Sequence, residues 1–128
     1  GWLDTTVLDL VENGMPILIL DASAACHMPD VLEMPYRPPL VDEPEKGGAV
    51  CRLAARTCLA GDVIGDYRFR RMPQVGERLS FGDMAIYSMV KTNTFNGMPL
   101  PAIALLREDG DCELVRTFDY YDFKGRLS

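Results

Sequence analysis

Three turn signals divide this 128-residue chain into short apolar segments, and they limit its fold more than any other feature. Asn13-Gly14, Asn96-Gly97 and Asp109-Gly110 are dipeptides that suit two-residue hairpin turns, where both residues need positive φ. The segments between such signals predict strands over residues 5–12, 16–20, 49–54, 66–71, 78–81, 85–90, 102–107 and 113–118. Short strands with these turns predict an all-β domain, a barrel or a sandwich.

Two segments depart from this pattern. Residues 22–48 contain Pro29, Pro35, Pro38, Pro39 and Pro44, a spacing that predicts no regular element. A loop this long inside a compact domain is usually functional or disordered, and residues 42–48 are expected to form its exposed tip. At the other end, residues 120–127 predict a short C-terminal helix.

Composition limits the function. The chain is 48% hydrophobic and 25% charged, which suits one packed domain spanning residues 1–128. Its formal net charge is −6, and Arg68, Arg70 and Arg71 are interpreted as a solvated strand face, so no nucleic acid is expected. The longest apolar run, residues 16–20, is too short for a membrane span, and no signal peptide is visible.

The thiols indicate the compartment. Four cysteines without a Cys-x-x-Cys pair and a single histidine, His27, predict no metal site. Reduced thiols are typical of a cytoplasmic protein.

Because the chain begins with Gly1 and enters its first strand at once, we expect it to be part of a longer protein.

Cys58 and Asp62 lie on either side of a glycine, in Cys58-Leu-Ala-Gly-Asp62. Taken alone, the pair is more simply a core cysteine beside a turn-forming aspartate. Further blocks follow: Ala-Ile-Tyr87-Ser-Met with Phe-Asn-Gly97 and Pro101, and before them a block from Asp21 to Pro38 that contains His27, Asp30, Glu33 and Arg37.

In order and spacing, these blocks resemble the ornithine and diaminopimelate decarboxylase superfamily. The block from Asp21 to Pro38 and the ending Tyr121-Asp-Phe-Lys124 resemble the carboxynorspermidine (carboxyspermidine) decarboxylases in particular. The resemblance covers essentially the whole chain. It implies the C-terminal β-barrel or sandwich domain of the alanine-racemase-like enzymes that use pyridoxal 5′-phosphate, preceded in the full protein by a TIM barrel.

The resemblance also implies the chemistry. The Schiff-base lysine would lie in the preceding barrel, since Lys46, Lys91 and Lys124 do not match its context. Cys58 would supply or position the proton that follows decarboxylation, and Tyr87 would bind the cofactor phosphate. Asp62 would contact a substrate amine. The family builds its site between two subunits, so a homodimer is expected, and this chain alone is expected to be inactive.

Departures from the superfamily indicate the substrate. Glu33 stands where diaminopimelate decarboxylases carry an arginine for a distal carboxylate. This exchange reverses the preferred charge, so Asp30 and Glu33 are predicted to bind the cationic tail of a polyamine-type substrate. The sequence does not separate carboxynorspermidine from carboxyspermidine, which differ by one methylene. His27 is interpreted mainly as structural, and Arg37 as either structural or a ligand of the substrate carboxylate.

Other functions stay open at this stage. The domain could belong to a diaminopimelate or ornithine decarboxylase, or to an inactive regulatory homologue of the same fold. A free-standing β-barrel that binds a small molecule without catalysis is a further alternative, although it leaves the order of Cys58, Asp62 and Tyr87 unexplained.

Overall fold

The computed structural model describes residues 1–34 and 36–127, and strands dominate them. In chain order the elements are β1 (Leu3–Glu12), β2 (Pro16–Leu20), α1 (Ala24–His27), α2 (Asp30–Glu33), β3 (Ala49–Ala54), β4 (Val63–Phe69), β5 (Arg78–Phe81), α3 (Tyr87–Val90), η1 (Phe95–Gly97), β6 (Ile103–Leu106), β7 (Cys112–Arg116) and α4 (Tyr120–Lys124). Every helix is a single turn, so the expected all-β fold is confirmed.

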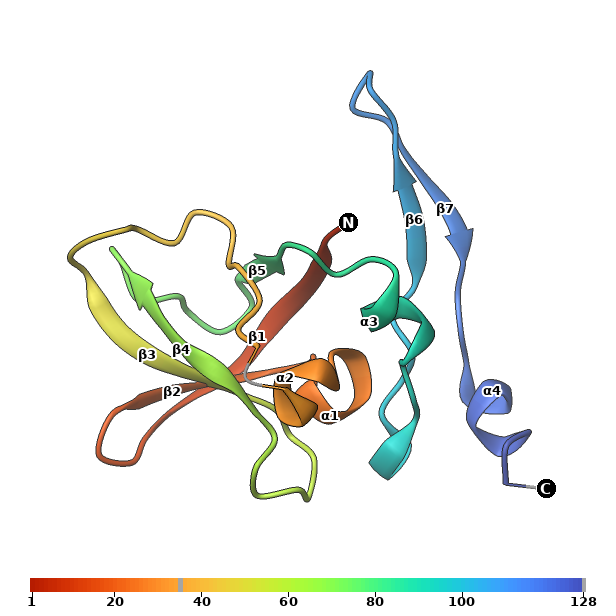
Figure 1. The fold of residues 1–128 in the computed structure, drawn as a ribbon, viewed down its shortest axis with the longest axis horizontal. Coiled ribbons are helices and arrows are strands. Elements are labelled where there is room, and N and C mark those ends of the chain that lie inside the picture. The colour runs from red at the N-terminus through yellow and green to blue at the C-terminus, as the bar shows by residue number, and fades with distance from the viewer. Residues whose placement is uncertain (35, 128) are drawn as a thin grey trace.

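A curved five-stranded sheet in the order β4-β3-β2-β1-β5 forms the body of the domain (Figure 1). Only β2 and β3 run parallel. β1 changes partner along its length: its first half pairs with β5, and its second half pairs with β2 after a register shift between Val7 and Asp9. An extra residue on one strand bends that strand, and this bulge helps β1 to curve the sheet.

The core lies on one face of this sheet because buried residues alternate along the strands. Leu18 and Leu20 of β2 and Cys51 and Leu53 of β3 are fully buried. Tyr67 of β4 packs against the ring of Phe81 in edge contact, with ring centroids 5.7 Å apart. Its hydroxyl donates to the carbonyl of Pro38.

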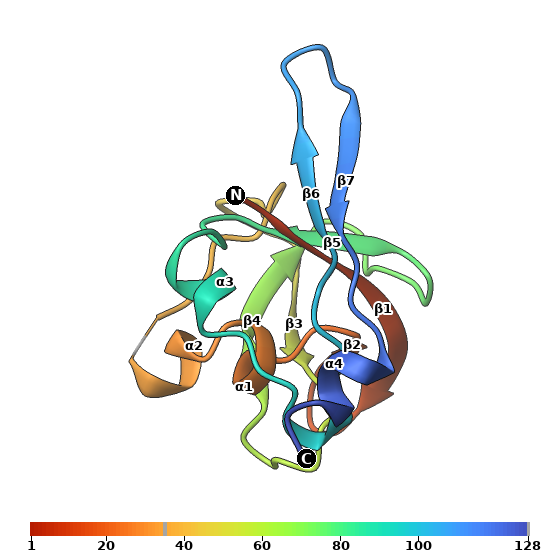
Figure 2. The same cartoon turned by 90° about the vertical axis from the view of Figure 1, so that its right-hand side faces the viewer.

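The β6–β7 hairpin stands apart from the sheet and projects beyond it (Figures 1 and 2). Asp109-Gly110 lies in the hairpin turn as expected, but only Gly110 of the two has positive φ, at 88°. The turn is longer than the two residues predicted, because the last strand pair is Leu106 with Cys112. The final helix, α4, begins with a capping box in which Asp119 and Asp122 satisfy each other's backbone N–H groups. The predicted C-terminal helix is thus present over residues 120–124.

Three expectations for local structure are wrong. The Pro-rich segment contains the helical turns α1 and α2, although its Pro35 lies outside the described residues. Ser23 caps α1. Pro29 immediately precedes the first residue of α2, a position where a missing N–H costs little. Residues 85–90 form no strand, because Ile86 has φ 63° and α3 follows it. Asn96-Gly97 has positive φ at both residues but belongs to η1 and joins no hairpin.

Candidate functional site

Helix α1 is the centre of a buried hydrogen-bond network that begins at Asp62. The Asp62 side chain is 3% exposed. Its carboxylate accepts from the Ser23 hydroxyl at 2.7 Å, from the Thr57 hydroxyl at 2.5 Å and from the Ala25 N–H at 3.1 Å. The loop between β3 and β4 is thereby fixed to the start of α1.

The sequence suggested a substrate contact for Asp62, and the observed contacts show that its carboxylate also has partners within the domain. A carboxylate that is buried and already accepts three protein hydrogen bonds is poorly placed to bind a substrate amine. Asp62 fixes the loop that carries Cys58 to the start of α1, and its contact with a substrate amine stays a prediction.

Cys58 lies exposed on that loop, and its thiol is free. Its backbone N–H donates to the Asn96 side-chain oxygen at 3.3 Å. Asn96 reaches this position from a left-handed backbone conformation, with φ 60° and ψ 19°, which asparagine tolerates better than most residues. The Cys58 loop is therefore held from two sides, by Asp62 and by Asn96.

The segment after α3 is also fixed to α1. The Asn93 side chain donates to the carbonyl of Ala25 at 2.8 Å, and its backbone N–H donates to the carbonyl of Cys26. The buried Cys26 thiol lies 3.4 Å from the carbonyl of Phe95, and burial raises the pKa of this thiol. Cys26 is fully buried and is thus a packing residue.

His27 completes the network as a neutral ring. Its Nδ1 accepts from the Ser23 N–H at 3.1 Å, and its Nε2 lies 3.0 Å from the carbonyl of Pro99, to which it donates. Burial lowers the pKa of His27, which favours the neutral form. These contacts agree with the structural interpretation of this histidine, which also lines the cavity described below.

The two carboxylates of α2, Asp30 and Glu33, meet a cation. The Lys91 ammonium at the C-terminal end of α3 lies 2.5 Å from Asp30 Oδ1 and 3.4 Å from Glu33 Oε2. The Asp30 side chain is 13% exposed, whereas that of Glu33 is 62% exposed. The hydrogen bond that Lys91 donates to Asp30 raises the pKa of Lys91, so this ammonium stays protonated.

Tyr87 begins α3 and presents its side chain to solvent, at 68% exposure. The preceding Ile86 has φ 63° and ψ −99°, a costly conformation for a β-branched residue. Such strain often accompanies a functional position. Tyr87 is available to a group outside this chain, but no hydrogen bond of its hydroxyl connects it to Cys58, Asp30 or Glu33 within the described residues.

The contacts of Arg37 agree with the structural interpretation of this residue. Its guanidinium pairs with Glu43 at 2.5 Å, donates to the carbonyl of Asp66 through two nitrogens and stacks 3.8 Å from the Tyr67 ring centroid. These contacts fix the Pro-rich segment to β4. They leave this side chain engaged within the domain.

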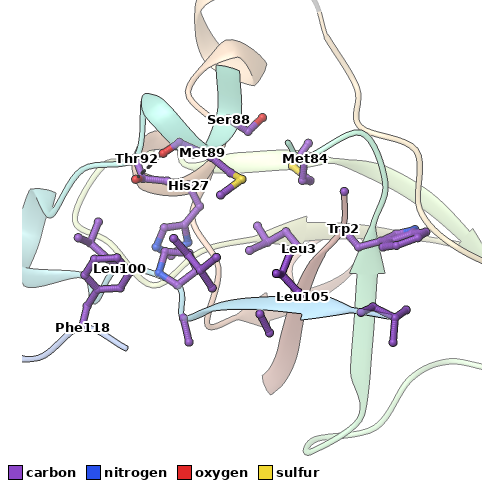
Figure 3. A pocket seen from close by; sticks show the side chains of 16 residues that line it. Trp2, Leu3, His27, Met84, Ser88, Met89, Thr92, Leu100, Leu105 and Phe118 are labelled. Carbon is purple, nitrogen blue, oxygen red and sulfur yellow. Dashed lines mark hydrogen bonds between the residues drawn. The ribbon is translucent and has the colours of Figure 1, made fainter. Parts of the chain in front are cut away.

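A cavity of about 440 Å³ lies between the start of β1, α3 and β6 (Figure 3). Its lining is mainly apolar, with Trp2, Leu3, Met89, Leu105 and Phe118 among the residues that the figure labels. Cys58, Asp62, Asp30, Glu33 and Tyr87 do not line it. Its mainly apolar lining suits neither a phosphate nor a polyamine, so the acidic pair of α2 and the Cys58 loop, outside this cavity, stay the candidate functional residues.

Two further findings concern the described part of the chain. It contains no cluster of three or more histidine, cysteine, aspartate or glutamate side chains that could hold a metal ion. None of its helices has the length and apolar character that a membrane crossing requires.

Sequence reasoning missed several residues of this arrangement. Lys91 was considered only as a possible Schiff-base lysine, and Asn96 only as a turn residue within the Phe-Asn-Gly97 block, with no contact to the Cys58 loop expected. Ser23 and Asn93 carried no signal beyond polarity, since their importance comes from contacts across about 40 and 70 residues of sequence. The opposite charges of the 30–33 segment and Lys91 are visible in the sequence, but only the fold shows that they form an ion pair.

Comparison with known proteins agrees with this geometry. Residues 1–85 match the family model described as "Pyridoxal-dependent decarboxylase, C-terminal sheet domain". This chain therefore belongs to the pyridoxal-dependent decarboxylases and corresponds to their C-terminal sheet domain.

Within that family, the most informative relatives are decarboxylases of carboxylated polyamines. Over 99% of this chain, the sequence is 52% identical to a carboxyaminopropylagmatine decarboxylase from Synechocystis, covering 34% of that protein. Over 98% of this chain it is 39% identical to a carboxynorspermidine/carboxyspermidine decarboxylase from Herminiimonas arsenicoxydans, again covering 34% of the relative. The chain thus spans about a third of the length of these relatives.

A solved structure gives the same result. The carboxynorspermidine decarboxylase of Campylobacter jejuni, complexed with norspermidine, superposes with a TM-score of 0.93 at 34% identity, over 98% of this chain and 38% of that one. The resemblance to the carboxynorspermidine decarboxylases, first seen in the motifs, is confirmed.

Proposed function

We propose that the intact protein decarboxylates an amino acid that carries a cationic polyamine-type tail, and that this chain supplies part of the active site. The single observation that carries the proposal is the acidic pair of α2, Asp30 and Glu33, which binds an alkylammonium group in this structure, that of Lys91. A substrate tail that ends in an amine presents the same chemistry to the pair.

The relatives support this substrate class. Their names specify carboxyaminopropylagmatine, carboxynorspermidine and carboxyspermidine as substrates. All three carry positive charge beyond the reacting carbon, as amines or as a guanidinium. A carboxylate binds either cation, and a guanidinium can add a bidentate pair. We therefore propose the carboxylated polyamines as the class and leave open which member is preferred.

Pyridoxal 5′-phosphate, when bound, stabilises the negative charge that remains on the substrate after carbon dioxide leaves. The residues of this chain fit such a group in part. Tyr87 offers an exposed phenolic O–H for its phosphate. Lys91 is unsuited to form the bond to the cofactor, because its ammonium is engaged by two carboxylates and its pKa is raised, whereas a nucleophilic lysine must lose its proton.

Cys58 is proposed as the proton donor. Its Sγ–H would give its proton to the α-carbon after carbon dioxide leaves, and the thiolate would then regain a proton from solvent. The support is its exposed thiol on a loop fixed through Asp62 and Asn96. A fixed donor close to the reacting atom contributes in proportion to its positioning.

The missing parts of the site are proposed to come from a barrel domain of the same protein and from a second subunit, in a cytoplasmic homodimer. The relatives are about three times as long as this chain, which leaves room for such a domain. Leu105, Leu106, Leu114 and Val115 of the β6–β7 hairpin are each more than half exposed, as expected for residues that pack against another domain or subunit.

Release of carbon dioxide tests the proposal. The intact protein, supplied with pyridoxal 5′-phosphate, is assayed with carboxynorspermidine, carboxyspermidine, carboxyaminopropylagmatine, diaminopimelate and ornithine. We expect turnover of at least one of the first three and little or none of the last two. Preferred turnover of diaminopimelate or ornithine would contradict the substrate class, and no turnover of any of the five would contradict the enzyme assignment.

A pair of cysteine variants tests the donor. Cys58→Ala should reduce kcat by roughly a hundredfold or more with a smaller change in KM, since a proton donor acts after the substrate is bound. Cys112→Ala is the matched control, because Cys112 is also an exposed free thiol but lies on β7. A kcat for Cys58→Ala within about twofold of the wild type would remove Cys58 from this role.

A further inference from the structure

Lys91 connects the two elements that carry the proposed substrate and cofactor contacts. It follows α3 directly, and its backbone N–H donates to the carbonyl of Tyr87 at 3.0 Å. Its ammonium reaches across to α2, where it bonds to Asp30 and Glu33. Lys91 is therefore the one side chain in the described network that contacts both carboxylates of the pair.

The charges at this point do not cancel. Asp30 and Glu33 bring two negative charges, α2 has no basic residue in its last turn, and Lys91 brings one positive charge. Nearby, the Tyr36 hydroxyl donates to Asp83 at 2.9 Å. Burial raises the pKa of Tyr36 to about 12, with further contributions from Asp83 and Asp30. The surroundings of α2 thus retain a net negative charge and can accept another cation.

The two carboxylates differ in how far Lys91 satisfies them. The Asp30 oxygen lies 2.5 Å from the ammonium and its side chain is shielded, whereas the Glu33 oxygen lies 3.4 Å away and its side chain is 62% exposed. A distance of 3.4 Å leaves a weak hydrogen bond. Glu33 is the carboxylate with free acceptor capacity toward the outside.

We propose that Lys91 determines substrate specificity by neutralising Asp30, which leaves Glu33 as the carboxylate that binds the substrate's tail cation. The inference rests on the proposed function and refines it: Asp30 becomes the partner of Lys91, and the site accepts one additional positive charge. The alternative is that the ion pair between α2 and Lys91 is purely structural. In that case, removing Lys91 should raise KM or leave it unchanged.

Four variants of the intact holoenzyme separate the two. Lys91→Met leaves both carboxylates to the substrate, so KM for carboxynorspermidine should fall about two- to fivefold, the range for partly exposed ion pairs. Asp30→Asn frees Lys91 to pair with Glu33, so KM should rise by a similar factor. The double variant Lys91→Met with Asp30→Asn restores one free carboxylate, and its KM should return close to the wild-type value.

Lys46→Met is the matched control, because Lys46 is an exposed lysine in the loop before β3 and its removal changes the net charge equally. It should leave KM unchanged. If circular dichroism shows that the Lys91→Met variant does not fold, Lys91→Gln is used in its place. The dissociation constant of norspermidine, measured by calorimetry on the same variants, gives the comparison without turnover.

An increase or no change in KM and in the norspermidine dissociation constant on removing Lys91 would overturn the inference, as would failure of the wild-type holoenzyme to bind norspermidine. If the wild type binds norspermidine with the predicted order of variants but decarboxylates none of the five substrates, the proposed function fails and the role of Lys91 stands.

Discussion

Substitution of Asp62 gives the largest effect that can be worked out from this structure. Its buried carboxylate accepts from Ser23, Thr57 and the Ala25 N–H. Hydrogen bonds to a charged group contribute about 1.5–3 kcal/mol each, and a buried N–H left without a partner costs about 1–3 kcal/mol. Because the losses overlap, Asp62→Ala should cost about 3–5 kcal/mol in the free energy of opening this loop.

Amide hydrogen exchange on the intact protein measures that free energy locally. A loss of about 3–5 kcal/mol corresponds to roughly a hundred- to several thousandfold less protection at Ala25, since about 1.4 kcal/mol is a factor of ten. Asp62→Asn keeps one acceptor oxygen and should lose about 1–2 kcal/mol. Asp66→Asn is the control: it breaks the exposed pair with Arg52 and should change the free energy by less than about 1 kcal/mol.

Kinetics of the same variants separate positioning from substrate contact. If Asp62 only positions the Cys58 loop, Asp62→Asn should lower kcat more than it raises KM, because the substrate still binds while the donor is misplaced. Unchanged protection at Ala25 in Asp62→Ala would refute the argument from the hydrogen-bond geometry. If Asp62→Asn raises KM and leaves kcat unchanged, the result would support the predicted contact between Asp62 and a substrate amine.

Three other substitutions follow from the geometry. Burial lowers the folded-state pKa of His27, so its contribution to stability is complete above a pH of about 6.5. Below that pH, the free energy of unfolding should fall by up to about 1.4 kcal/mol per pH unit. Urea unfolding from pH 5 to 8 should show this slope in the wild type and not in His27→Gln. Arg37→Met removes the Glu43 ion pair and the stacking on Tyr67 and should cost about 1–2 kcal/mol in urea unfolding, with only partial recovery in Arg37→Lys; no loss would contradict the structural role. Tyr87→Phe should weaken retention of pyridoxal 5′-phosphate by about 1.5–3 kcal/mol, measured as bound cofactor absorbance after dialysis, and unchanged retention would remove Tyr87 from the site.

Turn chemistry made much of the sheet predictable. Asn13-Gly14 and Asp109-Gly110 each join two strands that could pair, and both hairpins are present. Strands 49–54 and 78–81 have the expected bounds. Apolar and polar residues alternate in 78–81, whereas 49–54 is a short, mainly apolar run. The same dipeptide signal failed at Asn96-Gly97, where no pairing strand precedes it and the positive φ values serve a short helical turn.

Local preference was overridden where contacts come from far along the chain. The β-branched and aromatic residues around Tyr87 favour a strand, but no neighbouring strand is available to pair with them, and α3 is stabilised instead by the segment's attachment to α1 and α2. The candidate site follows the same rule. Its residue types were visible in the sequence, whereas the burial of Asp62 and the pairing of Lys91 with Asp30 depend on the fold.

If a carboxylate of α2 selects a substrate with a cationic tail, Glu33→Arg in the intact enzyme should reverse that selection. An arginine there would repel the tail cation, so kcat/KM for carboxynorspermidine should be abolished, with weak activity on diaminopimelate as the corresponding gain. Glu33→Gln, which removes the charge but keeps the shape, should mainly raise KM. Steady-state kinetics on both substrates, with circular dichroism to confirm folding, gives the result: a folded Glu33→Arg enzyme that keeps wild-type kcat/KM for carboxynorspermidine would contradict the claim.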